Sequence, residues 1–314
     1  MTNDGAISES IDQHFDPAIF AAGRGPRLRR QLGRNKLLLV GCAIILLSLF
    51  LAAFGPSIAP YDPTAATPEV AVPPPGLAEW PGLLLGSIRG TNAAPPHWLG
   101  TDQSGLDVFS RIISAPRTDM TISLSGAIIS CALGSLLGLL AGFTRNRATE
   151  LLMRVSDVLQ SFPVFILAMI LVTLSGRSIG NIVIALVMVY TPIFLRLTRA
   201  EVMGQVSRSY VEAARAAGNR PAVIALKHVL PNSMVPSLVQ MSVTIGFAII
   251  LTAGLSFVGA GVRPPTPEWG LMISLGAPQL ILGDWWPSVF PGLAMSVVVF
   301  GYAVVGHAFE ARFE

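Results

Sequence analysis

SYVEAARAAGNRPAVIALKHVLPN, residues 209–232, is a polar and basic stretch that lies between two long apolar segments. Ser209 and Glu212 have the spacing of a capping box, in which two side chains bond free backbone N–H groups at a helix start. The alanines that follow favour a helix and carry little bulk, and Gly218 can take the left-handed conformation that ends one. Pro221 suits the first turn of a second helix, which must stop near Leu230 because Pro231 cannot continue it. The stretch predicts two short helices, a tight bend between them, and an alanine face that a partner can approach closely.

Parts of this stretch resemble the EAA loop of bacterial ABC importer permeases, with Glu212-Ala213-Ala214, then Gly218, then Leu230-Pro231 at the family's spacing. The run from His228 to Asn232 is similar to the version found in the dipeptide, oligopeptide and nickel subfamily. The resemblance implies a cytoplasmic coupling helix, within a loop at about 200–232, that sits in a cleft of an ATPase subunit. The coupling residues that it implies are Tyr210, Glu212, Ala213, Ala214, Arg215, Ala217, Gly218, Leu230 and Pro231. From the local pattern alone, the alternative is an ordinary helical hairpin between two membrane spans.

The composition of the chain is that of a membrane protein. Of its 314 residues, 52% are hydrophobic and only 12% are charged, whereas a soluble domain has about 25% charged residues. Cys42 and Cys131 both fall inside apolar runs, which argues against a disulfide framework or a metal site. The sequence holds no Gly-rich phosphate loop of the GxxxxGK[ST] kind, so we do not expect this chain to hydrolyse ATP by that route.

Apolar runs predict an all-α polytopic protein with six transmembrane helices, because about 20 apolar residues cross a bilayer. We expect the spans at about 37–59, 121–143, 160–175, 179–197, 233–258 and 287–305. With both termini inside, all but five of the 21 Lys and Arg residues lie on the cytoplasmic side, as the positive-inside rule requires. The five outside are Arg89, Arg111, Arg117, Arg177 and Arg263. All five tryptophans lie on the outer side, where several are expected to anchor span ends at the membrane interface.

The spans divide the chain into segments of different character. Residues 1–36 form a cytoplasmic tail whose arginines directly precede the first span, which argues against the competing interpretation of nucleic-acid binding. Residues 37–119 hold the first span, a proline-rich external loop without regular helix, and an interfacial helix. Residues 120–308 form a five-helix core with the coupling loop, and 309–314 a short cytoplasmic tail. The tail departs from the family pattern, so no shared role is assigned to it.

The segment after the proline-rich loop, from His97 to Arg111, is similar to the family pattern HPLGTDxxGRDxxSR, from which it departs at Trp98 and Leu106. Asp102, Asp107 and Arg111 suggest a catalytic or metal cluster as one interpretation. We favour a structural role, because Asp107 and Arg111 are four residues apart and can pair on one face of the interfacial helix.

Further along the chain, Arg154 and Asp157 precede Phe162-Pro163, another pattern similar to the family, and predict a salt bridge at the membrane surface. The stretch 255–270, which contains Pro264-Pro265 and Glu268-Trp269-Gly270, again looks like the peptide-permease subfamily.

The predicted spans contain almost no ionisable residues, and a charge in the hydrocarbon marks an ion path by default. The pattern therefore argues against a proton-coupled transporter and, without a nucleophile–base pair or a metal-ligand set, against an enzyme. We assign no catalytic, cofactor-binding or metal-binding residue. Small residues predict close helix packing in the second span: Gly126, Ser130, Gly134, Ser135 and Gly138. The candidate pathway lining in the fifth span is Gln240, Ser242, Thr244 and Thr252.

The resemblance implies a permease subunit of the C type, with type I ABC importer architecture, in a bacterial inner membrane. It also implies a homologous second permease, two ABC ATPase subunits that bind ATP and Mg, an extracytoplasmic substrate-binding protein and membrane lipid as partners, without nucleic acid or a cofactor of its own. Peptides fit the subfamily best, while nickel, opines and other small solutes stay open. An ATP-independent channel or secondary carrier and a membrane-anchored scaffold are the alternatives from other classes.

Overall fold

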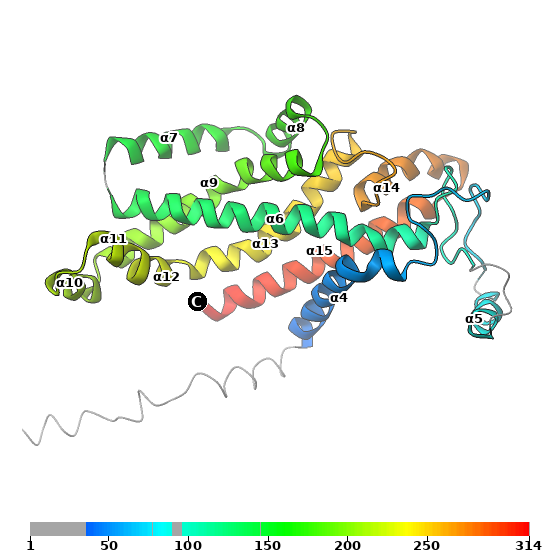
Figure 1. The fold of residues 1–314 in the computed structure, drawn as a ribbon, viewed down its shortest axis with the longest axis horizontal. Coiled ribbons are helices and arrows are strands. Elements are labelled where there is room, and N and C mark those ends of the chain that lie inside the picture. Colours follow the sequence, from blue (N-terminus) through cyan, green and yellow to red (C-terminus); the bar gives the residue numbers. More distant parts are fainter. Residues whose placement is uncertain (1–35, 77, 90–95, 145, 314) are drawn as a thin grey trace, which may run out of the picture. The chain divides into compact units, whose positions relative to one another are not determined.

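The computed structural model of the protein describes residues 36–76, 78–89, 96–144 and 146–313. Every regular element in these ranges is a helix, which confirms the predicted fold class (Figure 1). The helices are α4 (Lys36–Ile58), α5 (Trp80–Arg89), α6 (Val108–Phe143), α7 (Arg147–Ser161), α8 (Val164–Ser175), α9 (Ile179–Val206), α10 (Ser209–Ala216), α11 (Pro221–Val223), η1 (Ile224–Val229), α12 (Leu230–Ser233), α13 (Val235–Phe257), α14 (Trp269–Gly276), η2 (Ala277–Leu282) and α15 (Trp286–Phe313). The tail with the predicted arginine cluster lies outside the described residues, and contacts within Gly41–Glu314 form one compact unit.

Five described helices, α4, α6, α9, α13 and α15, are long and apolar enough to cross a membrane. The pair α7 and α8 makes a sixth span if it counts as one, but it bends by 96° at its junction. The predicted third span, 160–175, is therefore only partly right, because its apolar part is the 12-residue α8. Phe162 takes an extended conformation before Pro163, as the residue before a proline generally does.

Helix α6 has 36 residues and begins well before the predicted second span at 121. The prediction of a separate interfacial helix is wrong, because residues 108–120 are the first turns of α6. Small residues let α6 and α9 lie side by side at close range (Figure 1). A Cβ atom on Gly134 would lie 2.5 Å from Cβ of Phe194, and one on Gly138 would lie 2.7 Å from the carbonyl oxygen of Leu195. The predicted role of these glycines in close helix packing is confirmed.

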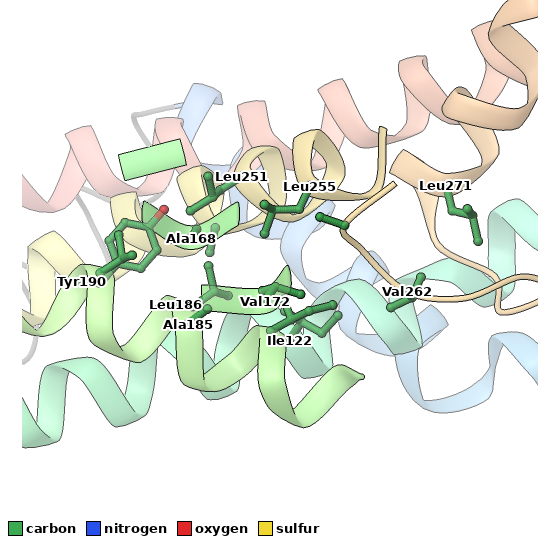
Figure 2. Close-up of a cluster of buried hydrophobic side chains, with 14 of the residues drawn as sticks. Ile122, Ala168, Val172, Ala185, Leu186, Tyr190, Leu251, Leu255, Val262 and Leu271 are labelled. Carbon is green, nitrogen blue, oxygen red and sulfur yellow. The ribbon is translucent and has the colours of Figure 1, made fainter. Parts of the chain in front are cut away.

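Helix α8 is held against the bundle by an apolar core that α6, α9, α13 and α14 share (Figure 2). Ala168 and Val172 of α8 are fully buried among side chains such as Ile122 of α6, Leu186 of α9 and Leu255 of α13. Helix α7 is different, since only Ser156 among its residues is buried. The broken span therefore has one half inside the core and one half on its surface.

The predicted salt bridge between Arg154 and Asp157 is wrong, because each of these residues of α7 pairs with a different partner. Arg154 bonds Glu150 at 2.9 Å, and Asp157 bonds Arg196 of α9. Side chains in a helix lean toward its N-terminus, so Arg154 reaches back one turn to Glu150. Asp157 instead faces α9 and ties the two helices together.

The end of the bundle opposite the 209–232 stretch is called the loop end here; it comprises residues 59–75 and 97–111 with the loop and helix at 258–286. Asp107 caps α6, where its carboxylate accepts from the backbone N–H of Ser110 at 2.7 Å and lies 2.7 Å from Nδ1 of His97. Arg111 donates to the carbonyl oxygens of Pro63 and Pro265, at 3.2 and 3.0 Å. The predicted pair between Asp107 and Arg111 is therefore wrong: capping turns the carboxylate to the helix start, and the arginine binds two loops instead.

Helix α14 is fixed at the loop end by its own cap and by tryptophans. Glu268 is fully buried and accepts from the N–H groups of Gly270 and Leu271 at 3.0 and 2.6 Å. Burial is the main cause that raises the pKa of this carboxyl group. Trp269 and Trp286 donate to the carbonyl oxygens of Ile112 and Thr101 from positions that are 2% and 5% exposed. These two tryptophans are internal braces, which corrects the prediction of interface anchors for them.

The proline-rich segment is more regular than the sequence predicted, because α5 forms a helix within it. Pro81 is the only proline of α5 and stands at its second residue, where a helix needs no N–H donor. Earlier in the segment, Thr67 and Val72 bond the backbone of Gly105 and Thr101. This part of the loop is therefore ordered against the start of α6.

Candidate functional site

The stretch from Ser209 to Ser233 forms a helical hairpin that connects two candidate membrane spans directly. Only Ser207 and Arg208 separate the end of α9 from α10, and only Met234 separates α12 from α13. Figure 1 shows α10 to α12 together beyond the end of α9. With such short connections, a displacement of the hairpin must move the ends of both spans.

The first helix of the hairpin starts without the predicted capping box. Arg208 is the capping residue and has an extended conformation, while Ser209 is already the first helical residue. The carbonyl oxygen of Arg208 accepts from the N–H groups of Val211 and Glu212, at 3.0 and 3.4 Å, and no side chain caps the helix. The prediction that Ser209 and Glu212 cap each other is wrong, because the helix begins one residue earlier than their spacing requires.

The predicted bend at Gly218 is confirmed. Gly218 has a φ angle of +81°, which L-residues rarely adopt. Around it, the N–H of Asn219 bonds the carbonyl oxygen of Ala214 at 3.2 Å and the N–H of Gly218 bonds that of Arg215 at 2.9 Å. These bonds satisfy carbonyl groups that the helix end leaves free. A Cβ atom on Gly218 would have open space around it, so its conformation, and not crowding, requires glycine here.

The second half of the hairpin is longer than predicted. Pro221 is the first residue of α11, as expected, but helical structure continues through η1 and α12 to Ser233. The predicted stop at Pro231 is wrong. The turn η1 has π-helical geometry, in which the N–H of Leu230 bonds the carbonyl oxygen of Ala225, five residues back. We attribute the tolerance of Pro231 to this wider turn, because proline clashes with the carbonyl group four residues back in a regular α-helix.

The inner side of the hairpin is an apolar mount on the ends of α6 and α9. Val211, Ile224 and Val229 are at most 1% exposed and pack with Leu139 of α6 and Val202 of α9. None of these three residues is among the predicted coupling residues. Ile224 and Val229 are five residues apart, the spacing of a π turn, so a search for the α-helical period does not single them out.

The outer side of α10 is exposed and presents small alanine side chains. Ala213, Ala216 and Ala217 share one helix face through their spacing of three and four residues, and all three are exposed. We call these three residues the alanine face. Ala214 is half-buried and belongs to the mount instead, together with Tyr210, whose hydroxyl donates to Gln205 at 2.9 Å.

The charges of the hairpin are free for other contacts. Glu212 and Arg215 are both exposed, and they form none of the ion pairs found between described residues. These two side chains, three residues apart on one helix, therefore do not pair with each other. Arg208, Arg220 and Lys227 are exposed as well, so the hairpin presents a basic surface around its alanine face.

The candidate pathway residues of α13 lie in two environments. Thr244 and Thr252 are 2% and 1% exposed, whereas Gln240 and Ser242 are half-exposed. Ser242 donates to the carbonyl oxygen of Tyr302 at 3.4 Å. Their role in a pathway stays a prediction. Among the residues that the structure describes, no three His, Cys, Asp or Glu side chains are grouped so that they would hold a metal ion.

Two family models of transport permeases match this chain. Residues 134–314 match the family model of the binding-protein-dependent transport system inner membrane component. Residues 27–74 match the model of the N-terminal TM domain of oligopeptide transport permease C. The first match contains the whole hairpin, and the second contains α4.

Three curated relatives extend the similarity over most of the chain. The di/tripeptide transport system permease protein DppC of Pseudomonas aeruginosa is 38% identical over 291 residues, which are 93% of this chain and 92% of the relative. The dipeptide transport system permease protein DppC of Escherichia coli K12 is 36% identical over 87% of both chains. The glutathione transport system permease protein GsiD of Pectobacterium atrosepticum is 35% identical over 67% of this chain and 69% of its own.

Proposed function

The chain belongs to the family of binding-protein-dependent transport system inner membrane components, and we propose that it is the permease subunit of an ATP-driven importer of short peptides. The relatives named for di- and tripeptides support this substrate class, and the relative named for glutathione, itself a tripeptide, agrees with it. Nickel, opines and other small solutes are the alternative cargo for the same architecture.

The observation that carries the proposal is the form of the hairpin. Its apolar mount of Val211, Ile224 and Val229 is buried on α6 and α9, while the alanine face opposite is bare. Side chains without bulk let a partner backbone come close, and exposed charges at the rim offer it ionic contacts. A partner that grips this face therefore acts on a body firmly attached to the membrane helices.

The proposed mechanism follows from these connections. ATP binding closes two ATPase subunits, and the cleft of one of them holds α10 by the alanine face. Because α9 and α13 join the hairpin through one or two residues, its displacement tilts both helices. The tilt turns the pathway from an inward-facing to an outward-facing form, in which an external binding protein delivers the peptide.

The remaining parts of the proposal concern topology and partners. Both termini and the hairpin lie in the cytoplasm, as the distribution of Lys and Arg favours. A homologous second permease completes the membrane part, and ATP and Mg are bound by the ATPase subunits. We expect the chain to perform no catalysis, as the relatives named as permease proteins support, and to carry no cofactor of its own.

Gly218→Val tests the coupling role of the hairpin. A β-branched residue is strained at a φ angle of +81°, so the bend changes and the alanine face turns away from its partner. We expect peptide uptake into proteoliposomes to fall at least about tenfold, while membrane insertion stays normal. The expected size follows from the loss of rate, often larger than about tenfold, that a misplacement of about 1 Å can cause in a step that depends on geometry.

The matched control is Gly259→Val at the loop end. Gly259 has a φ angle of +82° and the same open space around it, so it suffers the same backbone strain away from the hairpin. Uptake that stays normal in Gly218→Val, or falls equally in both variants, contradicts the coupling role.

The alternatives from other classes predict different behaviour. An ATP-independent channel or carrier transports peptide without ATPase subunits, so an ATPase that co-purifies with this chain and is required for uptake argues against it. A scaffold uses the hairpin only for docking, so deletion of residues 209–220 would release the partner without loss of uptake.

A further inference from the structure

A polar cavity of about 800 Å³ lies beside the hairpin end of the bundle, between α6, α7 and α9. One face of α7 supplies most of its lining, including Arg147, Glu150 and Arg154. Ala141 of α6 and Arg199 of α9 complete it on the bundle side. The cavity lies along α7, which rests on the bundle surface before the bend of 96° toward α8.

The charges that line this cavity are not balanced. Glu150 forms an ion pair with Arg154, and Asp157 forms an ion pair with Arg196 of α9. Arg147 and Arg199 have no acidic partner among the residues that the structure describes. The Nε atom of Arg199 is in addition buried without a hydrogen-bond acceptor in that part of the chain. A buried donor without an acceptor is unfavourable, so Arg199 indicates an anionic ligand, and the exposed guanidinium group of Arg147 lines the same cavity.

Apolar side chains on the exposed side of α7, next to these charges, indicate where that ligand comes from. Leu151, Val155 and Val158 are 61%, 51% and 59% exposed and follow one another at helical spacing. In a chain that spans a membrane, such a row faces acyl chains, while the polar face of the same helix lies at headgroup level. The cavity therefore opens where a lipid can place its phosphate between the arginines and its tails along α7.

We propose that this cavity binds the phosphate of an anionic phospholipid, with Arg147 and Arg199 as its ligands. A guanidinium group matches a phosphate with two parallel N–H donors, and two such groups compensate a phosphodiester charge well. The bound headgroup connects α7 to α9 next to the hairpin, where α7 otherwise has few buried contacts. This inference requires only that the chain spans a membrane and is independent of the cargo.

The experiment measures lipid binding to the full-length chain with its co-purified subunits, after delipidation in detergent, by native mass spectrometry. The probes are short-chain phosphatidylglycerol, phosphatidylcholine of the same chain length, and inorganic phosphate. We expect phosphatidylglycerol to bind, and its affinity to fall about fivefold for Arg147→Gln and for Arg199→Gln, since each basic residue near a lipid surface contributes at about that level.

Two further variants separate the site from effects on folding. Arg263→Gln removes an exposed arginine from the loop end and should leave lipid affinity unchanged. Glu150→Gln removes an exposed acidic group from the cavity lining and should raise the affinity for phosphatidylglycerol about fivefold, a gain that misfolding cannot produce.

The possible results divide clearly. Preference for phosphatidylglycerol that falls in both arginine variants and rises in Glu150→Gln supports the proposal. Equal binding of phosphatidylcholine, or unchanged binding in the double variant Arg147→Gln/Arg199→Gln, overturns it. Inorganic phosphate that binds as tightly as phosphatidylglycerol also overturns it, because the site then takes a free anion and not a lipid.

Discussion

The two ends of the helical bundle are built in opposite ways. At the loop end, Asp107, Arg111 and Glu268 are at most 1% exposed. The two carboxylates accept from N–H groups at the start of the helices that they cap, and Arg111 donates to the backbone of two neighbouring loops. At the hairpin end, Glu212 and Arg215 are exposed and make no ion pair with each other. Backbone hydrogen bonds and an aliphatic mount hold that end together.

This difference separates an end whose ionisable side chains bond within the chain from an end whose ionisable side chains are exposed. Buried and bonded polar groups fix a single arrangement, and a change in any of them leaves partners unsatisfied. Exposed side chains without intramolecular contacts contribute little to stability, so the hairpin surface is free to serve another subunit. We therefore expect substitutions at the loop end to reduce folding and substitutions on the hairpin surface to reduce coupling.

The largest expected difference between the ends comes from two glycines with nearly the same backbone conformation. Gly100 and Gly218 have φ angles of +77° and +81°. A Cβ atom on Gly100 would lie 2.3 Å from the carbonyl oxygen of Val72 and 2.9 Å from Nε1 of Trp286, whereas one on Gly218 meets nothing within 4 Å. Gly100→Ala should cost about 3 kcal/mol, from backbone strain and overpacking together, and Gly218→Ala about 1 kcal/mol from strain alone.

Thermal unfolding of the two variants in the same detergent measures this difference. Gly100→Ala should lower the melting temperature by about 6 °C or more, and Gly218→Ala by about 2 °C. Equal shifts would mean that the loop end yields to the added methyl group as easily as the hairpin does. The contrast between a rigid and an open end would then be wrong.

A smaller effect is expected at Asp107. Replacement by alanine removes the cap of α6 and leaves the N–H of Ser110 and Nδ1 of His97 without their partner. We expect a loss of about 2 kcal/mol in the free energy of unfolding.

Asp62→Ala is the matched control, because Asp62 also bonds a nearby backbone N–H, that of Thr64, but on an exposed turn of the same end. Little change is expected there. Equal losses in the two variants would show that burial at the loop end does not strengthen the bonds of Asp107. Chemical denaturation followed by tryptophan fluorescence compares them.

Much of this architecture follows from the sequence, because length and hydropathy decide whether a helix can cross a membrane. The five long spans and the bend at Gly218 come from such local rules, since a glycine after an alanine-rich helix needs no tertiary contact to end it. The third span was harder to predict. Whether Phe162 and Pro163 bend a span or break it depends on how α8 packs into the core, and that packing is not local.

One error at the candidate site and one at the loop end come from assuming regular helix geometry and spacing. The stop predicted at Pro231 assumed a regular α-helix, whereas η1 widens the turn and brings Ile224 and Val229 onto α6 and α9. The prediction of a pair between Asp107 and Arg111 assumed that opposite charges one helix turn apart bond each other. Buried polar side chains instead bond the unpaired backbone donors or acceptors that lie near them, and sequence spacing does not reveal those partners.

The smallest effect on stability, and the sharpest separation of stability from coupling, is expected from two neighbouring alanines. Ala213 is exposed on the alanine face, and Ala214 is half-buried against the mount. Ala213→Leu should change the free energy of unfolding by less than about 0.5 kcal/mol, yet it places a bulky side chain where an ATPase cleft would have to close. Ala214→Leu should overpack the mount and cost about 1 kcal/mol or more. Measured side by side, peptide-stimulated ATP hydrolysis should fall in Ala213→Leu at an unchanged melting temperature. If only Ala214→Leu lost activity, and did so in proportion to its lost stability, the exposed face would have no partner, and the hairpin would be an ordinary connection between two spans.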